Sequence, residues 1–297
     1  MRRHRLWTLG FLFVCCIAAA RTLSPPQGVR VSTAQVQAQQ AAQCYHGCPT
    51  LDPQWAQGST IFVARDAYAL DESTATKIPL WVAEHVTIDE ITGSAQRGGF
   101  RADPLLERGQ RAELTDYRET DAAGNHYDRG HQAPAGNHKR SQRRMDSTFY
   151  LSNMAPQQPG LNRKLWRHLE EVSRAWVRER GEAYEITGPI FWNGGSITPR
   201  RKYATIGPDR VAIPTHFYKI IVAPVEQGST EYDAIAFVAE NRVYDYDYPL
   251  QDLVKSIDWI EQRTGLNFMP GLTTPERKRL KTTKADFWPV TKGTRNE

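Results

Sequence analysis

The 297-residue sequence contains no internal repeat, no heptad pattern and no low-complexity tract that extends through the chain. These absences exclude a repeat solenoid, a coiled coil and a collagen-like fibre. Long hydrophobic runs are also absent. The longest uncharged hydrophobic run, Leu6–Ala20, has 15 residues, whereas a transmembrane helix needs about 20. The chain does contain 40% hydrophobic and 10% aromatic residues, with a mean hydropathy of −0.58. This composition excludes a disordered chain and a polytopic membrane protein, and it predicts a soluble globular protein.

Acidic residues are missing from the N-terminal region, where the first one is Asp52. Met1–Arg5 carries three arginines, and the apolar run that follows ends in small residues at Ala18–Ala20. These features are typical of a signal peptide, residues 1–20, and they predict export to the periplasm or the medium. A mitochondrial presequence is the alternative, because such a segment also lacks acidic residues. Cleavage after Ala20 would remove three arginines and no acid, so the formal net charge would fall from +5 to +2.

Cysteines are few, and only 4 occur in the chain. Cys15 and Cys16 lie in the apolar run and would leave with the signal peptide, so the mature chain would keep Cys44 and Cys48. An isolated pair in an exported protein is most simply one small disulfide loop. A zinc site is the alternative, but it would need two further ligands at recognisable spacing. Residues 21–43, which become rich in Gln and Ala, are expected to form a linker before this loop.

Strand and helix signals begin at about Leu51. A helix is predicted over Leu161–Arg180, where Gly181 provides a stop. A second amphipathic helix is predicted over Leu250–Ile260, with a stop at Gly265. Strands are expected over Leu80–Thr87, Thr148–Ser152, Tyr184–Phe191, His216–Ala223 and Asp233–Glu240.

This order of elements predicts one mixed α+β domain over residues 44–275, built around a central antiparallel sheet. Residues 93–127 contain many Gly, Arg, Asp and Glu and few apolar residues, so they are expected to be irregular surface. Residues 276–297 form a basic tail that opens with Arg277–Arg279. That tail either contacts polyanions or is simply solvated.

The most informative segment begins at Asp128–Pro134. Because a strand alternates its faces, Arg129 and His131 would point the same way, with Gly130 leaving room between them. A guanidinium binds phosphate oxygens through a planar fork, and an imidazole can take a proton near neutral pH. The pair therefore suits a phosphodiester substrate. By itself, however, the motif is better explained by a structural histidine beside a surface arginine.

The helix predicted over Leu161–Arg180 carries two neighbouring stripes of residues. The core stripe comprises Leu165, Leu169, Val172 and Trp176, and the second comprises Asn162, Trp166, Glu170 and Arg174. Trp166 is expected to pack, whereas the other three members place an amide oxygen, a carboxylate and a guanidinium along one edge. Singly, each is most simply part of a solvated face. Together with a strand that carries His131, they predict a ββα-metal motif.

On these residues the chain resembles the DNA/RNA non-specific endonuclease family of the ββα-metal superfamily. Asp128–Gln132, followed by Gly136, matches the family signature. Other segments similar to the family occur in the same order: Ala64–Leu70, Trp81–Ala83, Leu151–Gln157, Leu161–Asn162, Leu169–Glu170, Ile186–Pro189 and Arg263–Leu266. The resemblance covers roughly residues 44–272. The cysteine pair resembles the N-terminal disulfide loop of secreted bacterial members, while Asn137–Gln157 is more similar to the mitochondrial endonuclease G branch.

The resemblance implies a role for each matching residue. His131 matches the general base, Asn162 the metal ligand, and Glu170 a residue that orients metal-bound waters. Arginines around the phosphate are matched by Arg65, Arg129 and Arg174. Asp128 is expected to act through a metal-bound water or as a support behind the ligand, and Asn153 to hold the adjoining loop. Two departures from the family pattern bear on substrate preference. Arg163–Lys164 follows Asn162 where relatives often have smaller or polar residues, and the 93–127 insert is idiosyncratic.

The implied cofactor is Mg²⁺, with Mn²⁺ as the alternative, because a hard ion held by one amide oxygen must keep several waters. The implied reaction is hydrolysis of DNA and RNA to 5′-phosphate ends, without sequence specificity because the phosphate backbone carries no sequence information. No stable membrane insertion is expected after signal removal, and both a monomer and a homodimer stay open. The competing hypotheses are a non-catalytic nucleic-acid-binding relative and a metal-dependent phosphodiesterase acting on lipids or small phosphoesters.

Overall fold

The computed structural model describes residues 38–39, 42–195, 197 and 202–290. The expected signal peptide and most of the expected linker lie outside these residues. The end of that linker is part of the domain, because Gln43 is buried, donates to the carbonyl of Asp66 and accepts from the backbone N–H of His85. The disulfide between Cys44 and Cys48 is confirmed. None of the described helices is both long and apolar enough to cross a membrane.

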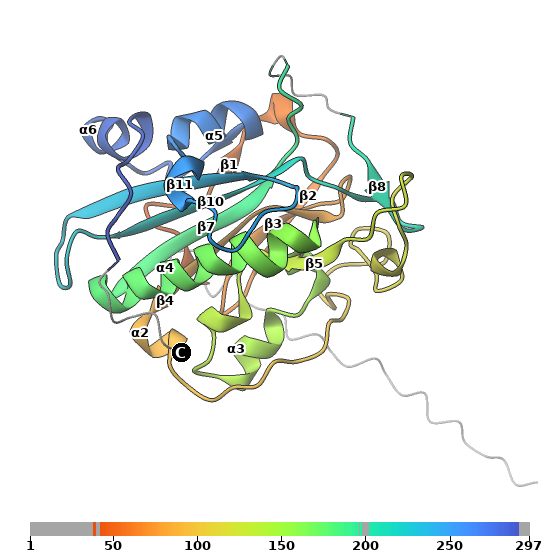
Figure 1. The fold of residues 1–297 in the computed structure, drawn as a ribbon, viewed down its shortest axis with the longest axis horizontal. Helices are drawn as coiled ribbons and strands as arrows, with labels where there is room; N and C mark the ends of the chain where they lie inside the picture. The colour runs from red at the N-terminus through yellow and green to blue at the C-terminus, as the bar shows by residue number, and fades with distance from the viewer. Residues whose placement is uncertain (1–37, 40–41, 196, 198–201, 291–297) are drawn as a thin grey trace, which may run out of the picture. The chain divides into compact units, whose positions relative to one another are not determined.

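The centre of the fold is a seven-stranded antiparallel sheet with the order β12-β11-β10-β7-β4-β3-β2 (Figure 1). Its strands are β2 (Thr60–Ala64), β3 (Ala69–Ser73), β4 (Ile78–Thr87), β7 (Glu182–Ile190), β10 (His216–Pro224), β11 (Tyr232–Glu240) and β12 (Val254–Lys255). In this register Glu84 of β4 lies opposite Glu185 of β7. The α+β class and four of the five predicted strands are confirmed.

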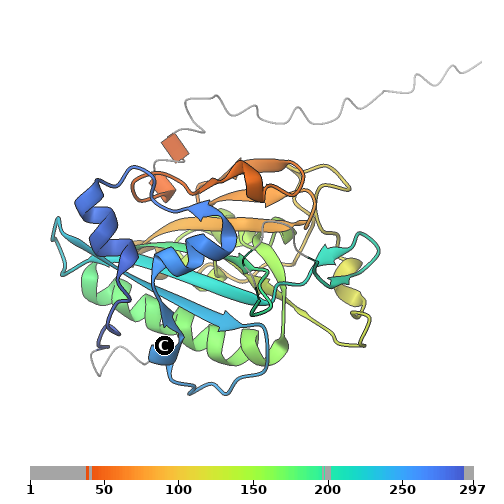
Figure 2. The ribbon, with the colours of Figure 1, turned by 90° about the horizontal axis from the view of Figure 1, so that it is seen from above.

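Both faces of the sheet are covered, because apolar residues occupy both sides of the long strands. On β10, Phe217 and Ile221 belong to one core and Ile220 and Val222 to the other. Helix α4 (Arg167–Arg180) covers the first face, while α5 (Ile257–Thr264) contributes to the second (Figure 1). The view from above shows α4 extending along the long strands (Figure 2). A strand buried on both faces reads as a nearly continuous apolar run, as β10 does between Phe217 and Ala223 apart from Lys219.

Short elements complete the described chain. Two-stranded pairs join β1 (Thr50–Leu51) to β13 (Leu266–Asn267), β5 (Asp128–His131) to β6 (Met154–Gln157), and β8 (Thr205–Ile206) to β9 (Val211–Ala212). The remaining α-helices are α2 (Ile88–Ile91), α3 (Gln142–Ser147) and α6 (Thr274–Arg277). Single 3₁₀ turns occur at Pro53–Trp55, Asp116–Arg118, Ala135–Asn137, Leu151–Asn153 and Leu250–Leu253, and π-helical turns at Leu161–Trp166 and Lys278–Thr282.

Two predicted elements have different positions in the structure. The strand expected at Thr148–Ser152 is wrong, since a 3₁₀ turn occupies Leu151–Asn153 and the strand follows as β6. Apart from the half-buried Tyr150, residues 148–157 are all buried, so hydrophobicity could not locate the strand within this run. The helix expected over Leu250–Ile260 begins only at Ile257, because Val254 pairs with the sheet edge and the Ser256 side chain caps the helix.

Two segments expected to be irregular or solvated are partly packed. In the 93–127 insert, which is largely irregular, Asp103, Ala112 and Asp116 are buried. In the basic tail, the Lys281 ammonium is buried and donates to Glu261 and Asn267. The described part of the tail is therefore anchored on the domain rather than freely solvated.

Candidate active site

A cleft of about 490 Å³ opens where β5, β6 and the long helix meet. β5 pairs antiparallel with β6, and the chain then enters a π-helical turn that leads into α4. Arg129 and His131 both line this cleft, as their alternation on the strand predicts. Gly130 is needed for a different reason than expected. A Cβ atom there would clash with the Gln157 side chain, so its missing side chain leaves room behind the strand.

The imidazole of His131 is largely buried between two aromatic rings. Its side chain is 9% exposed, and ring centroids lie 5.1 Å from Phe149 and 5.6 Å from Phe100. Among the described residues its Nε2 atom has no hydrogen-bond partner. Burial, and then the nearby charge of Arg97, lower the pKa of His131 to about 3. The ring is therefore neutral near pH 7, which is the form that can accept a proton.

Asn162 and Asp128 are joined across the mouth of the cleft. The Asn162 Nδ2 group donates to Asp128 Oδ2 at 2.8 Å, so the amide oxygen is the atom left for a cation. Arg163 holds the same carboxylate through its Nε and Nη2 groups at 2.8 and 2.6 Å. Burial raises the pKa of Asp128, but hydrogen bonds from Arg163 and Asn162 outweigh it, and the pKa lies below its ordinary value. Asp128 is thus an anion that orients the Asn162 amide.

Glu170 and Arg174 line the same cleft about two and three helical turns beyond Asn162. Burial raises the pKa of the Glu170 carboxyl to about 7, against the lowering effects of Arg174 and Lys219. The Arg174 guanidinium donates from Nη1 to Asn137 Oδ1 at 3.3 Å. A Cβ at Gly136 would lie 2.9 Å from that Nη1 atom, so the glycine of the signature lets the guanidinium approach.

Two predicted site residues do not line the cleft. The Nη2 group of Arg65 donates to both carboxylate oxygens of Asp103, at 2.5 and 2.6 Å, and the guanidinium lies over the Tyr150 ring at 4.3 Å. Asn153 is fully buried, and its amide bonds both backbone groups of Ala133 as well as a third partner, the carbonyl of Thr148. Asn153 therefore contacts the chain just after the signature, the position expected of it.

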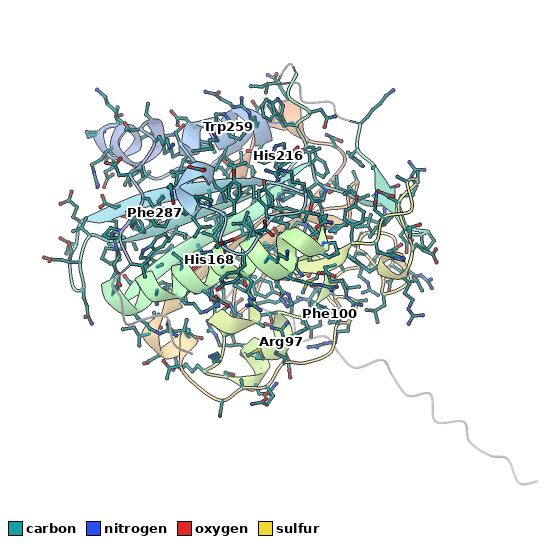
Figure 3. All side chains as sticks on the ribbon, viewed as in Figure 1. Arg97, Phe100, His168, His216, Trp259 and Phe287 are labelled. Atoms are coloured by element: carbon teal, nitrogen blue, oxygen red, sulfur yellow. A yellow bond between two sulfur atoms is a disulfide. The ribbon has the colours of Figure 1, made fainter. Side chains whose placement is uncertain are left out.

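The opposite wall of the cleft is formed by residues that the sequence patterns did not predict. Arg97 and Phe100 come from the 93–127 insert, and Figure 3 labels both on the α3 side of the cleft. The Arg129 guanidinium lies over the Phe100 ring at 4.3 Å, and Arg97 lies over Phe149 at 5.3 Å. No local pattern distinguishes Phe100 within this polar insert, because its role depends on contact with His131, 31 positions away in the chain.

The donor set decides which metal fits. In the described part of the chain, no three His, Cys, Asp or Glu side chains gather into a metal cage. The cleft instead offers the amide oxygen of Asn162 and the carboxylate of Glu170. Such a sparse oxygen set fits a hard ion that keeps most of its waters, such as Mg²⁺, and does not fit structural zinc.

Comparisons with known proteins identify similar nucleases. A sequence profile described as DNA/RNA non-specific endonuclease matches residues 52–274. The human protein named mitochondrial endonuclease G is 38% identical over 216 residues, which are 70% of this chain and 69% of that protein. Nuclease C1 of Cunninghamella echinulata var. echinulata is 35% identical over 217 residues, 71% of this chain and 83% of that protein. A crystal structure of the EndoG/EndoGI complex aligns with a TM-score of 0.67 at 33% identity, and it covers 79% of this chain and 91% of that chain.

Proposed function

The chain belongs to the DNA/RNA non-specific endonuclease family, and on that premise we propose that it is a metal-dependent endonuclease that hydrolyses DNA and RNA without sequence specificity. The observation that carries this proposal is the meeting of His131, Asn162 and Glu170 with two arginines, Arg129 and Arg174, in one cleft. The relatives named endonuclease G and nuclease C1 support the reaction class.

In this proposal each side chain has a defined task. Since Nε2 of His131 is buried, we assign proton acceptance from the attacking water to Nδ1. Arg129 and Arg174 bind non-bridging oxygens and neutralise the charge that develops on the phosphorus centre. A divalent ion, when bound by Asn162, supplies Lewis-acid stabilisation of the departing 3′ oxygen. Expected products carry 5′-phosphate and 3′-hydroxyl ends.

The low pKa of His131 has a mechanistic consequence. A base with a pKa of about 3 is fully neutral but a weak proton acceptor. A bound phosphate brings negative charge next to the ring, and that charge raises the pKa toward the working pH. We therefore expect His131 to become an effective base only when substrate occupies the cleft.

A cleavage assay tests the function directly. Purified wild-type protein is incubated with supercoiled plasmid and with single-stranded RNA, in chelator and then with added Mg²⁺ or Mn²⁺. Metal-dependent nicking of DNA and degradation of RNA, absent in His131→Ala, support the proposal. Inactivity on both polymers, together with hydrolysis of a small phosphodiester, would instead identify the phosphodiesterase alternative. Binding to DNA without any cleavage would identify the non-catalytic alternative.

We further propose that the chain is exported, with residues 1–20 as the signal. The disulfide between Cys44 and Cys48 supports an oxidising compartment, while relatives named mitochondrial nucleases support the mitochondrial alternative. N-terminal sequencing of the mature protein, with a thiol titration under denaturing conditions, separates the two. An intact N-terminus or two free thiols would contradict export.

A further inference from the structure

A group of charged side chains lies buried on the sheet beneath α4, behind the cleft. Lys219 of β10 pairs with Glu185 of β7 at 2.7 Å and donates to Thr187 at 2.8 Å. Ser173 of α4 also donates to Glu185, so this carboxylate has several partners. Its cross-strand neighbour Glu84 is 1% exposed and, within the described part of the chain, pairs with no lysine or arginine of its own. Burying a carboxylate without a paired cation costs free energy, so Glu84 must be accommodated by hydrogen bonds.

Glu84 is held by the segment that follows the signature. Its Oε2 atom lies 2.9 Å from Nε2 of His138, and its Oε1 accepts from Nδ2 of Asn137 at 3.1 Å. Burial, followed by the charge of Glu185, raises the pKa of Glu84 well above its ordinary value, and burial lowers the pKa of His138 to about 3. A neutral carboxyl that donates to Nε2 of a neutral imidazole avoids a buried ion, although Nδ1 of His138 has no hydrogen-bond partner among the described residues.

The contact with Asn137 extends this group to the cleft. Asn137 is 1% exposed, and its amide has two ends with opposite hydrogen-bonding character. Because the nitrogen is taken by Glu84, the oxygen is turned toward Arg174, whose Nη1 donates to it at 3.3 Å. If the amide flipped, its NH₂ group would face the guanidinium and donor would oppose donor. Glu84 thus determines which end of the amide Arg174 meets.

We propose that Asn137 is a positioning residue that holds the Arg174 guanidinium in the cleft, and that Glu84 sets the orientation of the Asn137 amide. This inference rests on the proposed endonuclease function, in which Arg174 binds the scissile phosphate. An arginine side chain has many rotamers. A guanidinium that populates several of them contributes less to catalysis than one that is held in a single orientation. We therefore expect Asn137→Ala to lower kcat about tenfold, with little change in KM.

A double-mutant cycle separates positioning from a merely structural role. If Asn137 acts through Arg174, Asn137→Ala lowers kcat in the wild type but adds nothing in the Arg174→Ala background. Asn241→Ala is the matched control. Asn241 is also an amide that bridges separate segments, since it donates to the carbonyls of Pro156 in β6 and of Pro214 and accepts from the backbone N–H of Gln158. None of these three partners lines the cleft. Its effect on kcat should be the same in both backgrounds.

A conservative substitution at Glu84 should preserve activity. In Glu84→Gln the amide oxygen can still accept from Asn137 while its NH₂ group donates to Nε2 of His138, so kcat should stay within about twofold of the wild type. Glu84→Ala removes the acceptor and should behave as Asn137→Ala does. Equal losses of kcat in Asn137→Ala with and without Arg174, or a Glu84→Gln variant as slow as Glu84→Ala, would overturn the proposal.

An NMR measurement keeps the inference separate from the proposed function. The Nε–H resonance of Arg174, assigned by its loss in Arg174→Ala, reports the guanidinium environment whether or not the protein cleaves anything. We expect this resonance to shift and broaden in Asn137→Ala and to stay unchanged in Asn241→Ala. An unchanged Arg174 resonance in Asn137→Ala refutes positioning, whereas an inactive wild type with the expected shift refutes only the function. Thermal melts confirm that every variant compared is folded.

Discussion

The two walls of the cleft are built from different kinds of backbone. On one wall, β5 and α4 carry His131, Glu170 and Arg174 on regular elements that the central sheet supports. The other wall is the irregular segment with Arg97 and Phe100, and its backbone is tied to the chain after α3 through hydrogen bonds between Arg101 and both Phe149 and Leu151.

This difference indicates that the two walls have different roles in the site. Groups that must be placed within a fraction of an ångström lie on regular elements, where backbone geometry sets their positions. The irregular wall supplies an environment, because Phe100 and Phe149 exclude water from His131. Changes to the first wall should therefore abolish chemistry, whereas changes to the second should tune it.

The largest effect is expected for the general base. His131→Ala should keep the fold and substrate binding but reduce the cleavage rate by about 10²–10⁴-fold, the usual value of a positioned base. Rates from a plasmid-nicking time course, with a DNA-binding assay in chelator as the control for folding, measure both quantities. Cleavage within a few-fold of the wild type would show that His131 is not the base.

The metal ligand should come next. Asn162→Ala should lose most activity at any Mg²⁺ concentration, with the melting temperature nearly unchanged, because a water-rich ion site contributes little to the fold. Asn162→Asp keeps an oxygen donor, but it adds a negative charge beside Asp128 and beside a polyanionic substrate. Tighter metal binding should therefore accompany slower turnover.

Nicking rates and melting curves across a Mg²⁺ titration, for Asn162→Ala and Asn162→Asp, test this second prediction. In the wild type, chelator should abolish cleavage, and added Mg²⁺ should restore it without refolding. Cleavage by the wild type that resists chelation contradicts the metal assignment for the whole cleft.

A smaller effect is expected for Arg129→Lys. The positive charge stays, but the planar fork that can grip two phosphate oxygens is lost, and so is its stacking on Phe100. We expect kcat/KM to fall about tenfold, about the effect of losing one charge-assisted hydrogen bond. The matched control is Arg108→Lys, an exposed arginine of the insert outside the cleft. Equal activities of both variants would mean that Arg129 is only a surface charge.

The smallest effect on rate, and the sharpest test of the second wall, is Phe100→Ala. Losing the ring exposes His131 to water, which raises its pKa from about 3 toward the ordinary 6.5. Since the base must be neutral, the acid limb of the pH profile of kcat/KM should move to higher pH, with only a few-fold loss at pH 8. Leu105→Ala, an exposed side chain of the same insert, is the control. If the acid limb does not move, it reports the ionisation of another group, such as Glu170, whose pKa is about 7.

Local patterns predicted much of the first wall. The four-residue spacing from Asn162 to Arg174 placed amide, carboxylate and guanidinium on one helix edge, and the structure shows all three lining the cleft. The same reasoning misplaced β6, because the polar residues Ser152 and Asn153 just before it are as buried as the apolar ones, so polarity does not mark where the strand begins. Arg65, for which the family resemblance implies a place at the phosphate, pairs in the structure with the buried Asp103 of the insert.

The sequence by itself determined the α+β class, the long strands, the helix with its polar edge and the cysteine pair, because each depends on residues a few positions apart. Only the tertiary structure decided that the insert closes over His131 and that Glu84 orients Asn137 toward Arg174. These contacts join residues between 31 and 53 positions apart. Such pairs meet only after the sheet and helix have packed, so no local period of 2 or 3.6 residues records them.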